Sequence, residues 1–238
     1  MKTFILSPEI IQKLQNIVGE SFLFLDQETR NNYGHDETED YVFPPSVVLK
    51  PGTVEEISEI MKLAFQYEIP VTPIGGRTGL SGGALSIHGG IGLSMDRFNR
   101  ILHIDEQNLQ VIVEPGVVTQ TLQEAVLEKS LFYPPDPSSR GSCFIGGNVA
   151  ENAGGARAVK YGVTKDYVLN LEVVLPNGEI IWTGANTLKN STGYNLTQLM
   201  VGSEGTLGII TKIVMKLLPK HNHNILMLVP FFNSSQAC

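Results

Sequence analysis

The distribution of glycine constrains this 238-residue chain more than any other feature of its sequence. All but three of its 24 glycines lie between Gly75 and Gly208, and most of these fall in three clusters, at residues 75–83, 141–155 and 202–208. Glycine at such density marks backbone that adopts positive φ angles or that comes very close to another group. Because three separate glycine turns are costly in chain entropy, we expect one extended ligand to pass all three.

The first cluster follows directly on a predicted strand at residues 69–74. The backbone N–H groups of such a turn can converge on an anion, and a diphosphate is a common occupant. The cluster is not a Walker motif, because no Gly-Lys-Ser/Thr follows, and its spacing differs from the G-x-G-x-x-G dinucleotide fingerprint. For any single cluster, a tight turn that only allows close backbone packing remains the competing interpretation.

Composition and charge exclude several other classes of protein. Two cysteines cannot build a disulfide framework, and no closely spaced Cys/His set indicates structural zinc. The longest apolar run, residues 225–232, is too short to span a membrane, and residues 1–19 do not read as a signal peptide. The whole net charge of −7 lies in residues 1–60, so general binding to nucleic acid is disfavoured. We expect this acidic leading segment to lie outside the ligand-binding surface.

Local patterns predict a chain of two parts. Ser7 and Thr53 each begin a helix, the second with a capping box to Glu56, and strands at residues 46–50 and 69–74 complete a right-handed βαβ unit. An Asn-Gly turn predicts a later hairpin. We expect mixed α/β structure with parallel strands first and antiparallel β-structure with attached helices second, with the join near residues 105–116. The remaining expected elements are strands at 91–95, 101–104 and 109–113, a helix from 118 or 119, irregular chain at 25–45 and 133–161, hairpin strands at 169–175 and 179–183, a helix at 195–200, and a strand at 209–218.

Five motifs in a fixed order make the sequence recognisable. They are residues 33–38 (YGHDET), 73–83 (PIGGRTGLSGG), 141–155, 161–166 (YGVTKD) and 202–212 (GSEGTLGIITK). The chain resembles the flavoproteins of the vanillyl-alcohol oxidase and p-cresol methylhydroxylase (PCMH) superfamily. Within that superfamily it is similar to the branch of glycolate oxidase FAD subunits, D-lactate dehydrogenases and D-2-hydroxyglutarate dehydrogenases.

The resemblance implies an α+β fold of the PCMH type, in which two α/β subdomains hold FAD between them. We expect an N-terminal helical and irregular segment at residues 1–40 and an FAD-binding domain at 41–220, with subdomains at about 41–110 and 111–220. Residues 221–238 would begin a substrate-binding cap domain, whose first strand is expected at residues 225–232. Members of this branch are about twice as long, so we expect this chain to be the N-terminal, FAD-binding part of such an enzyme; a genuine short homologue is the alternative.

The resemblance also implies which residues contact the cofactor. We expect the loop from Gly75 to Ser81 to wrap the FAD diphosphate, residues of the second cluster to line the isoalloxazine and ribityl side, and Glu204 with Ile209 and Ile210 to form the wall near the nucleotide half. The expected cofactor-binding residues are Pro73, Gly75, Gly76, Arg77, Thr78, Gly79, Leu80, Ser81, Pro135, Asp136, Ser142, Gly146, Gly147, Asn152, Ala153, Glu204, Gly208, Ile209 and Ile210.

Other candidate residues receive more modest interpretations. The cofactor segments contain Arg77 and Cys143 and no histidine, so we expect non-covalent FAD, with Cys143 a small buried residue. Arg77 is the arginine expected to face the diphosphate, whereas Arg140 and Arg157 are expected in surface ion pairs. His221 and His223 have a metal-like spacing but no third ligand, so we expect no metal site.

The implied function is an FAD-dependent dehydrogenase or oxidase of a D-2-hydroxy acid, of the glycolate, D-lactate or D-2-hydroxyglutarate type. The substrate C2 hydride would pass to flavin N5. The catalytic base is unknown and is expected in the missing half, so this chain would turn over poorly alone.

The expected electron acceptor is a quinone, a cytochrome, an electron-transfer flavoprotein or an iron–sulfur subunit. A homodimer is left open, and the expected location is the cytoplasm, with peripheral association at the inner membrane as the alternative. Two other readings of the function remain. One is a flavoenzyme of the same fold that acts on another substrate, such as a sugar or an aldonolactone, and the other is a non-catalytic subunit that keeps the fold.

Overall fold

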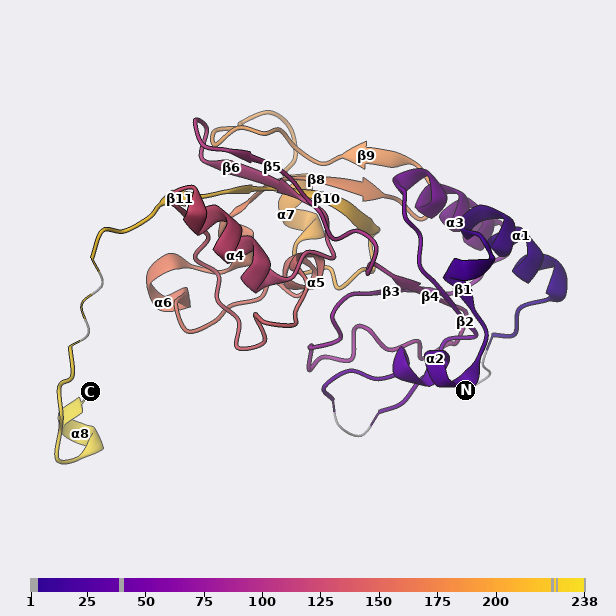
Figure 1. The fold of residues 1–238 in the computed structure, drawn as a ribbon, viewed down its shortest axis with the longest axis horizontal. Coiled ribbons are helices and arrows are strands. Elements are labelled where there is room, and N and C mark those ends of the chain that lie inside the picture. The colour runs from indigo at the N-terminus through magenta and orange to yellow at the C-terminus, as the bar shows by residue number, and fades with distance from the viewer. Residues whose placement is uncertain (1–3, 39–40, 224, 226, 238) are drawn as a thin grey trace.

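A computed structural model describes residues 4–38, 41–223, 225 and 227–237 of the chain. Its described residues form a four-stranded sheet, a five-stranded sheet and a short two-stranded ribbon. Figure 1 shows the two larger sheets next to each other, with α1 and α3 covering the first one and α4 lying over the second. This arrangement leaves the strand ends of the two sheets facing a common region, where the glycine-rich segments lie.

The four-stranded sheet is mainly parallel. Its strand order is β1-β2-β4-β3, in which β2 and β3 each pair in parallel with β4 and β1 pairs antiparallel with β2. The predicted βαβ unit is therefore confirmed, although β4 is inserted between its two strands. The elements of this half are α1 (Pro8–Val18), β1 (Leu23–Phe24), α2 (Gln27–Asn32), β2 (Val47–Leu49), α3 (Val54–Gln66), β3 (Val71–Ile74) and β4 (Ile91–Ser94).

The two long helices of this half begin where the sequence predicts. The Ser7 hydroxyl accepts a hydrogen bond from the Ile10 N–H at 3.3 Å, and the Thr53 hydroxyl accepts one from the Glu56 N–H at 3.2 Å. The Glu56 carboxylate completes the cap of α3 by accepting the N–H of Gly52 at 2.7 Å. Both helices bury their apolar faces against the sheet. This core includes Leu14, Val47, Ile57, Ile60 and Leu93, each fully buried.

The five-stranded sheet is antiparallel, as expected. Its order is β5-β6-β10-β8-β9, and the predicted hairpin joins β8 to β9 through Gly178 at φ +85°. Leu122 and Val126 of the covering helix pack on Leu171 and Ile213 of the sheet. The elements of this half are β5 (Ile101–Asp105), β6 (Gln110–Val113), α4 (Thr119–Glu128), β7 (Leu131–Phe132), α5 (Ile145–Ala150), α6 (Ala158–Tyr161), β8 (Val168–Val174), β9 (Ile180–Trp182), α7 (Leu196–Met200), β10 (Ile209–Lys216) and β11 (Leu218–Pro219).

Three helices occur where the sequence predicts irregular chain. α2 lies within residues 25–45, and α5 and α6 lie within residues 133–161. Each has six residues or fewer, so none shows the repeated apolar face from which helices are recognised. α5 also contains Gly146 and Gly147, which disfavour a helix locally. α2 nevertheless has a local cap, because the Asp26 carboxylate accepts the N–H of Thr29 at 2.7 Å.

The chain passes from the first sheet to the second between Ser94 and Ile101, ahead of the join expected at 105–116. β5 has the apolar character of a strand but carries no local signal of which sheet it joins. Its antiparallel pairing with β6 assigns it to the second sheet. The division of the chain into domains remains a prediction.

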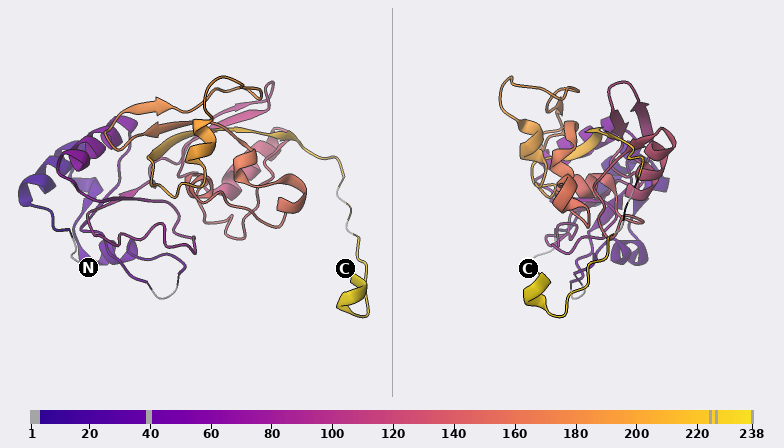
Figure 2. Two further views of the ribbon diagram at one scale, coloured as in Figure 1. Left: turned by 180° about the vertical axis from the view of Figure 1, so that it is seen from behind. Right: turned by 90° about the vertical axis from the view of Figure 1, so that its left-hand side faces the viewer.

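The C-terminal segment extends away from both sheets. After β11 the chain runs outward and ends in α8 (Ser234–Ala237), as Figures 1 and 2 show from opposite sides. The strand expected at residues 225–232 is not formed by the part of this segment that the structure describes, and residue 226 lies outside that part. A strand needs a paired neighbour, whereas here the side chain of Phe232 is 99% exposed.

A direct contact braces the two sheets against each other. The buried hydroxyl of Ser58 on α3 donates a hydrogen bond to the carbonyl of Gly178, in the β8–β9 turn, at 2.6 Å. Val174 and Ile209 of the second sheet also pack into the hydrophobic core of the first. The relative position of the sheets, and with it the space between their strand ends, is therefore fixed by buried contacts.

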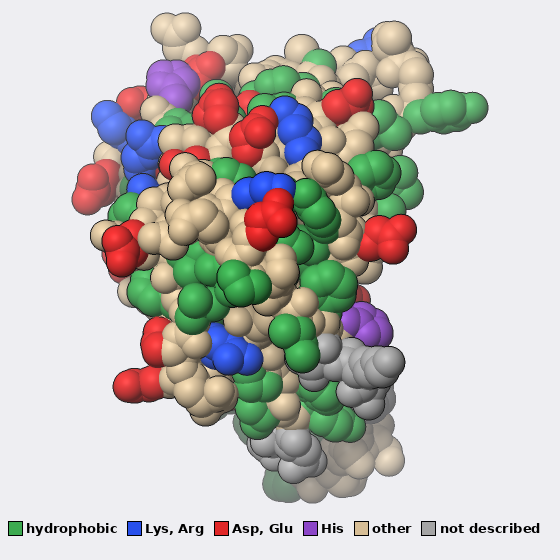
Figure 3. All heavy atoms as spheres, turned by 90° about the vertical axis from the view of Figure 1, so that its right-hand side faces the viewer, with side chains coloured by type: hydrophobic (Ala, Val, Ile, Leu, Met, Phe, Trp, Pro, Cys, Tyr) green, Lys and Arg blue, Asp and Glu red, His purple; other side chains and the backbone are tan. Residues whose placement is uncertain are grey.

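The outer face formed by the N-terminal helices carries mixed charge. Figure 3 shows acidic, basic and hydrophobic side chains interspersed on this face, without one basic patch of the kind that binds nucleic acid. Among the described residues, none of the helices is both long enough and apolar enough to cross a bilayer.

Candidate functional site

A cleft between the two sheets brings the three glycine clusters together. Its walls are the loop after β3, the segment that contains α5, and the turn that leads into β10. Strand ends from both sheets contribute, with Ile74 and Met95 on one side and Pro115 and Ile210 on the other. Segments that lie far apart in the sequence, such as Gly75 and Ile210 at a separation of 135 positions, therefore line one cavity. This arrangement supports the expectation that a single ligand passes all three clusters.

Some glycines of the cleft have no structural reason to be glycine. A Cβ built on Gly147 has no atom within 4 Å, and one on Gly79 first meets the Glu151 carboxylate at 3.5 Å. A Cβ on Gly75 would be 3.8 Å from its nearest neighbour, Phe144. None of the three has a positive φ angle. Because neither conformation nor packing excludes a side chain, these glycines fit a cradle that a ligand occupies.

Other glycines of the same segments are required by the packing of the protein itself. A Cβ on Gly76 would be 2.6 Å from the carbonyl oxygen of Ser142, and one on Gly146 would be 2.5 Å from Pro115. Gly205 has a φ of +74° and lies against the ring of Pro73, which docks the third cluster onto β3. These glycines hold the three walls of the cleft at close range.

Three residues with side chains adopt positive φ angles in the glycine-rich segments around the cleft, and two of them, Arg77 and Glu204, line it. The three are Arg77 at +58°, Asn152 at +51° and Glu204 at +51°. This conformation is unfavourable for residues with a Cβ and is concentrated at functional sites. One such residue occurs in each of the three glycine-rich segments, in keeping with backbone shaped for binding.

The guanidinium of Arg77 contacts the N-terminal segment. It lies over the ring of Tyr33, 4.6 Å from its centre, and its Nη1 donates to the side chain of Asn32 at 3.1 Å and to the Asn32 carbonyl. Arg77 lines the cleft, but in this structure its charge secures α2 against the glycine loop. The expected contact of this side chain with a diphosphate remains a prediction.

A partly buried charge network lies next to this contact. The Tyr33 hydroxyl donates to the Asp96 carboxylate, and the Lys50 ammonium donates to the same group at 2.9 Å. Burial alone would raise the pKa of Asp96, but the hydrogen bond from Tyr33 and the charge of Lys50 outweigh it, so this pKa lies below its usual value. The network ties α2 to β2 and to the end of β4.

The acidic leading segment does not lie wholly outside the site, which corrects the expectation from its charge. Asp36 lines the cleft and is 8% exposed. The N–H of Glu37 donates to the carbonyl of Gly79 at 3.1 Å, so this segment packs directly on the glycine loop. Charge counting along the sequence missed this because the contact joins residues about forty positions apart.

Most of the expected cofactor residues line the cleft. They are Pro73, Gly75, Gly76, Arg77, Thr78, Gly79, Leu80, Gly146, Gly147, Ala153, Glu204, Gly208, Ile209 and Ile210. Their contact with a cofactor is a proposal, but the structure brings them into one place.

Five expected residues lie outside the cleft lining and make contacts within the protein. The Ser81 hydroxyl donates to Glu151 at 2.8 Å, and the Ser142 hydroxyl donates to the Ser139 carbonyl at 3.2 Å. Pro135 accepts a hydrogen bond from Gln123, and Asn152 accepts the N–H of Lys165. Asp136, nine-tenths buried, pairs with Arg140 at 2.9 Å and Arg157 at 3.4 Å. These residues support the walls from behind.

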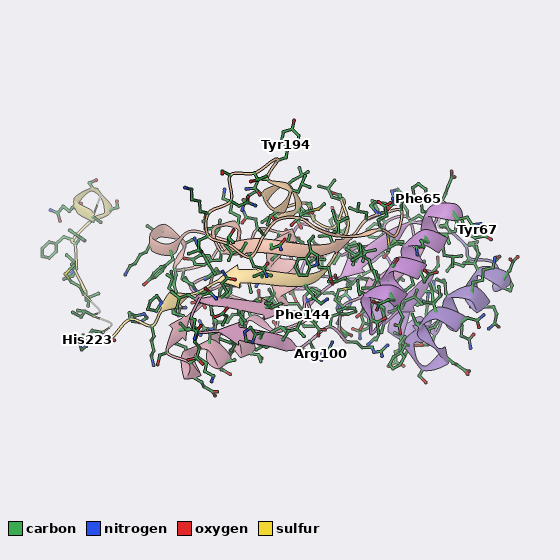
Figure 4. All side chains as sticks on the ribbon, turned by 90° about the horizontal axis from the view of Figure 1, so that it is seen from above. Phe65, Tyr67, Arg100, Phe144, Tyr194 and His223 are labelled. Carbon is green, nitrogen blue, oxygen red and sulfur yellow. The ribbon has the colours of Figure 1, made fainter. Side chains whose placement is uncertain are left out.

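The cleft also contains residues that the sequence did not single out. Phe144, Asn148 and Glu151 belong to the second glycine cluster, from which the sequence predicts only Ser142, Gly146, Gly147, Asn152 and Ala153 as cofactor-binding residues. Figure 4 shows Phe144 in the middle of the molecule, where the two halves of the chain meet. Met95 and Pro115 simply follow strands, so only the sheet topology could place them. The further lining residues are Asp36, Ile74, Gly83, Ala84, Pro137, Ser139, Cys143, Ala150, Ser203 and Gly205.

Cysteine and histidine side chains have ordinary surroundings. Cys143 is buried, with its Sγ 3.2 Å from the Thr119 hydroxyl. The His221 ring packs edge-on against Phe132, and His223 lies on the extended tail, away from the cleft (Figure 4). Among the described residues, no group of three or more His, Cys, Asp or Glu side chains is arranged to hold a metal ion. The second cysteine, Cys238, lies outside the described residues.

Comparison with known proteins identifies the family. The model of the FAD binding domain family matches residues 45–184, which span both sheets and most of the cleft. The chain belongs to the FAD binding domain family. FAD is therefore the cofactor that this family binds. The positions of Gly75, Gly79 and Gly147 leave space for a ligand in the cleft. The comparison gives no indication of covalent attachment.

The expected resemblance to hydroxy-acid flavoenzymes is confirmed. The chain is 47% identical over 205 residues to the glycolate oxidase subunit GlcD of Bacillus subtilis, covering 86% of this chain and 44% of that protein. It is 44% identical over 228 residues to D-lactate dehydrogenase of Anaerostipes hadrus, covering 95% and 48%. It is 37% identical over 210 residues to D-2-hydroxyglutarate dehydrogenase of Stutzerimonas stutzeri, covering 88% and 45%. The chain thus spans about half the length of the curated relatives it matches.

Solved structures confirm the expected PCMH-type fold. An alkyldihydroxyacetonephosphate synthase superposes with a TM-score of 0.79 at 25% identity, covering 92% of this chain and 42% of that one. Substrate-bound p-cresol methylhydroxylase superposes with a TM-score of 0.76 at 23% identity, covering 90% and 44%. The second likeness concerns the fold alone.

Proposed function

We propose that this chain holds FAD for the oxidation of a D-2-hydroxy acid of the glycolate, D-lactate or D-2-hydroxyglutarate class. The observation that carries the proposal is the convergence of three glycine clusters on one cleft in a member of the FAD binding domain family. The substrate class rests on the names of relatives that are 37% to 47% identical to this chain.

In this proposal the residues of the chain bind and orient the cofactor. The loop from Gly75 to Leu80 surrounds the diphosphate, and its backbone N–H groups supply the donors. Gly147 leaves room for a flat ring system, and Ile209 and Ile210 form part of the wall near the nucleotide half of the cofactor. Bound FAD supplies the acceptor for the hydride that leaves C2 of the hydroxy acid.

The proposal includes non-covalent binding of FAD. No histidine is found among the described residues that line the cleft, and the Cys143 sulfur already contacts the Thr119 hydroxyl. Denaturation in acid should therefore release all of the flavin into the supernatant. Flavin that stays with the precipitated protein would contradict this part of the proposal.

Partners and location are proposed from the resemblance. The electron acceptor is a quinone, a cytochrome, an electron-transfer flavoprotein or an iron–sulfur subunit, in keeping with the similarity to a glycolate oxidase subunit. The proposed compartment is the cytoplasm.

The catalytic base is assigned to none of the side chains described above.

Anaerobic reduction of the flavin tests the substrate class. FAD-loaded protein is mixed separately with D-lactate, glycolate and D-2-hydroxyglutarate, and the visible absorbance of the flavin is followed. We expect at least one of these acids to bleach the flavin, slowly, and L-lactate to bleach it more slowly than D-lactate.

The same experiment separates the alternatives. Bleaching by a sugar or an aldonolactone, and by none of the hydroxy acids, would favour another enzyme of the same fold. Protein that retains FAD but is bleached by neither class would favour a non-catalytic subunit.

A further inference from the structure

Asp36 differs from the other acidic side chains of the cleft. Asp36, Glu151 and Glu204 all line it, but only Asp36 is buried, with 8% of its surface exposed. A carboxylate loses hydration when it is buried and normally recovers hydrogen bonds from the protein. The hydrogen-bond partners of its two carboxylate oxygens therefore indicate the role of Asp36.

One oxygen of Asp36 is fully engaged by a local turn. Its Oδ1 accepts the N–H of Thr38 at 3.0 Å and the Thr38 hydroxyl at 2.5 Å. The neighbouring N–H of Glu37 bonds to the Gly79 carbonyl, which fixes the turn against the glycine loop. The carboxylate is thus held in place before any ligand arrives.

The other oxygen has no partner. Asp36 Oδ2 is buried and receives no hydrogen bond from any residue that the structure describes. An unpaired buried acceptor is destabilising, so such a group is explained most simply by a donor that arrives with a ligand. The carboxylate lines the cleft in which the FAD binding domain family holds its cofactor.

We infer that Asp36 accepts a hydrogen bond from a hydroxyl or N–H group of FAD bound in the cleft. The inference rests on the assignment of this cleft to FAD. The ribityl chain and the ribose carry hydroxyl donors, and the two ring systems carry N–H donors. The diphosphate carries no donor and would repel a carboxylate, so Asp36 contacts a part of the cofactor beside the diphosphate.

The change in FAD affinity caused by Asp36→Asn shows whether Asp36 accepts a hydrogen bond from FAD or only repels its diphosphate. Asparagine retains Oδ1 for the contacts with Thr38 but replaces the free oxygen with an amide donor. If Asp36 accepts a hydrogen bond, the variant binds FAD about ten- to one-hundredfold more weakly. If Asp36 only faces the diphosphate, removal of its charge strengthens FAD binding, and the inference is overturned.

The experiment measures FAD dissociation constants by flavin fluorescence and the unfolding temperature of the protein without FAD. For Asp36→Asn we expect weaker FAD binding with no fall in the unfolding temperature. Glu37→Gln is the matched control, because it makes the same change of charge one residue away on an exposed side chain outside the cleft lining, and its affinity should stay within about twofold of wild type. A lower unfolding temperature for Asp36→Asn with unchanged affinity would show a purely structural role and overturn the inference.

A second variant keeps the test valid if Asp36→Asn does not fold. Asp36→Ser retains a small hydroxyl that can form the same kind of turn with Thr38 and removes the free oxygen. It should show the same loss of FAD affinity, and wild-type affinity in a folded Asp36→Ser would overturn the inference.

Titrations with ADP and with FMN locate the donor. Weaker binding of ADP to Asp36→Asn assigns the contact to the adenosine half, and weaker binding of FMN assigns it to the flavin and ribityl half. Wild-type protein that binds FAD, with Asp36→Asn equal to it, overturns this inference and leaves the proposed function intact. Wild-type protein that binds no FAD overturns both.

Discussion

At the residue scale, the glycines of the cleft separate into two groups with different causes. Gly76 and Gly146 are glycine because backbone or proline atoms lie where a Cβ would stand. A Cβ on Gly147 would face open space, and one on Gly79 would make only an ordinary contact with the Glu151 carboxylate at 3.5 Å. Neither glycine has a positive φ angle, so the protein alone would accept a Cβ at both positions. Glycine therefore allows close packing at the first two positions and leaves space for a ligand at the other two.

This distinction predicts that Gly147→Ala stabilises the protein without FAD but weakens its binding of FAD. Gly147 lies within α5, where alanine should stabilise the helix by roughly 0.5–1 kcal/mol. The new methyl group would occupy the cradle, so FAD affinity should fall about tenfold. Urea unfolding without FAD and a fluorescence titration with FAD measure the two effects.

The neighbouring substitution Gly146→Ala serves as the control. Its Cβ would stand 2.5 Å from Pro115, so this variant should lose stability in the absence of FAD. Gly147→Ala that binds FAD as tightly as wild type would refute the assignment of the open glycines to the cofactor.

The Asp96 network predicts a pH dependence of stability. Because the folded-state pKa of Asp96 is lowered, its carboxylate contributes stability above the unfolded value of about 4 and loses it as the pH falls through the folded value. Asp96→Asn should therefore be less stable than wild type at pH 7, and the difference should shrink below about pH 4. A difference that is equal at pH 7 and pH 3 in urea unfolding would disprove this account.

Residue patterns in the sequence predicted much of the cleft, including Glu204, but not Asp36. Gly75, Gly79 and Gly147 stood out because their type and clustering are unusual. Asp36 did not, because it is one of four acids within residues 36–40, and only the contact between Glu37 and Gly79 brings it to the cleft. Side chains selected by tertiary contact leave no local signature.

At the element scale, the best predictions were those with a local physical cause. The caps at Ser7 and Thr53 and the Asn-Gly hairpin are each determined within four residues. α2 and α5 have six residues each, too few to show a repeated apolar face, so the sequence did not predict them. The strand expected at residues 225–232 has the right composition but no neighbour to pair with.

The brace between α3 and the β8–β9 turn predicts the cost of removing one hydroxyl. Ser58→Ala would leave the buried Gly178 carbonyl without its donor, so the free energy of unfolding should fall by about 1–3 kcal/mol. Glu59→Ala, on the exposed side of the same helix, should change it by less than about 0.5 kcal/mol. Equal stabilities of the two variants in urea unfolding would show that the contact does not brace the sheets.

At the scale of the whole molecule, two sheets of different topology form one binding site at their facing ends. The parallel and antiparallel characters of the two sheets were predictable from strand spacing and turns. Their relative placement was not, because it depends on contacts such as Ser58 with Gly178 and Gly76 with Ser142, which join distant parts of the chain. Only this relative placement of the sheets brings the three glycine clusters to one cleft.

The central claim is that one FAD molecule lies across the three glycine clusters. Its most direct test is an equilibrium titration of FAD into wild-type protein and Gly79→Val, whose Cβ would lie in the lining of the cleft with no contact shorter than 3.5 Å, the distance to the Glu151 carboxylate. We predict one FAD per wild-type chain and an affinity at least about tenfold weaker for the variant, at an unchanged unfolding temperature without FAD. Equal affinities of the two proteins, or no FAD binding by wild type, would contradict the claim.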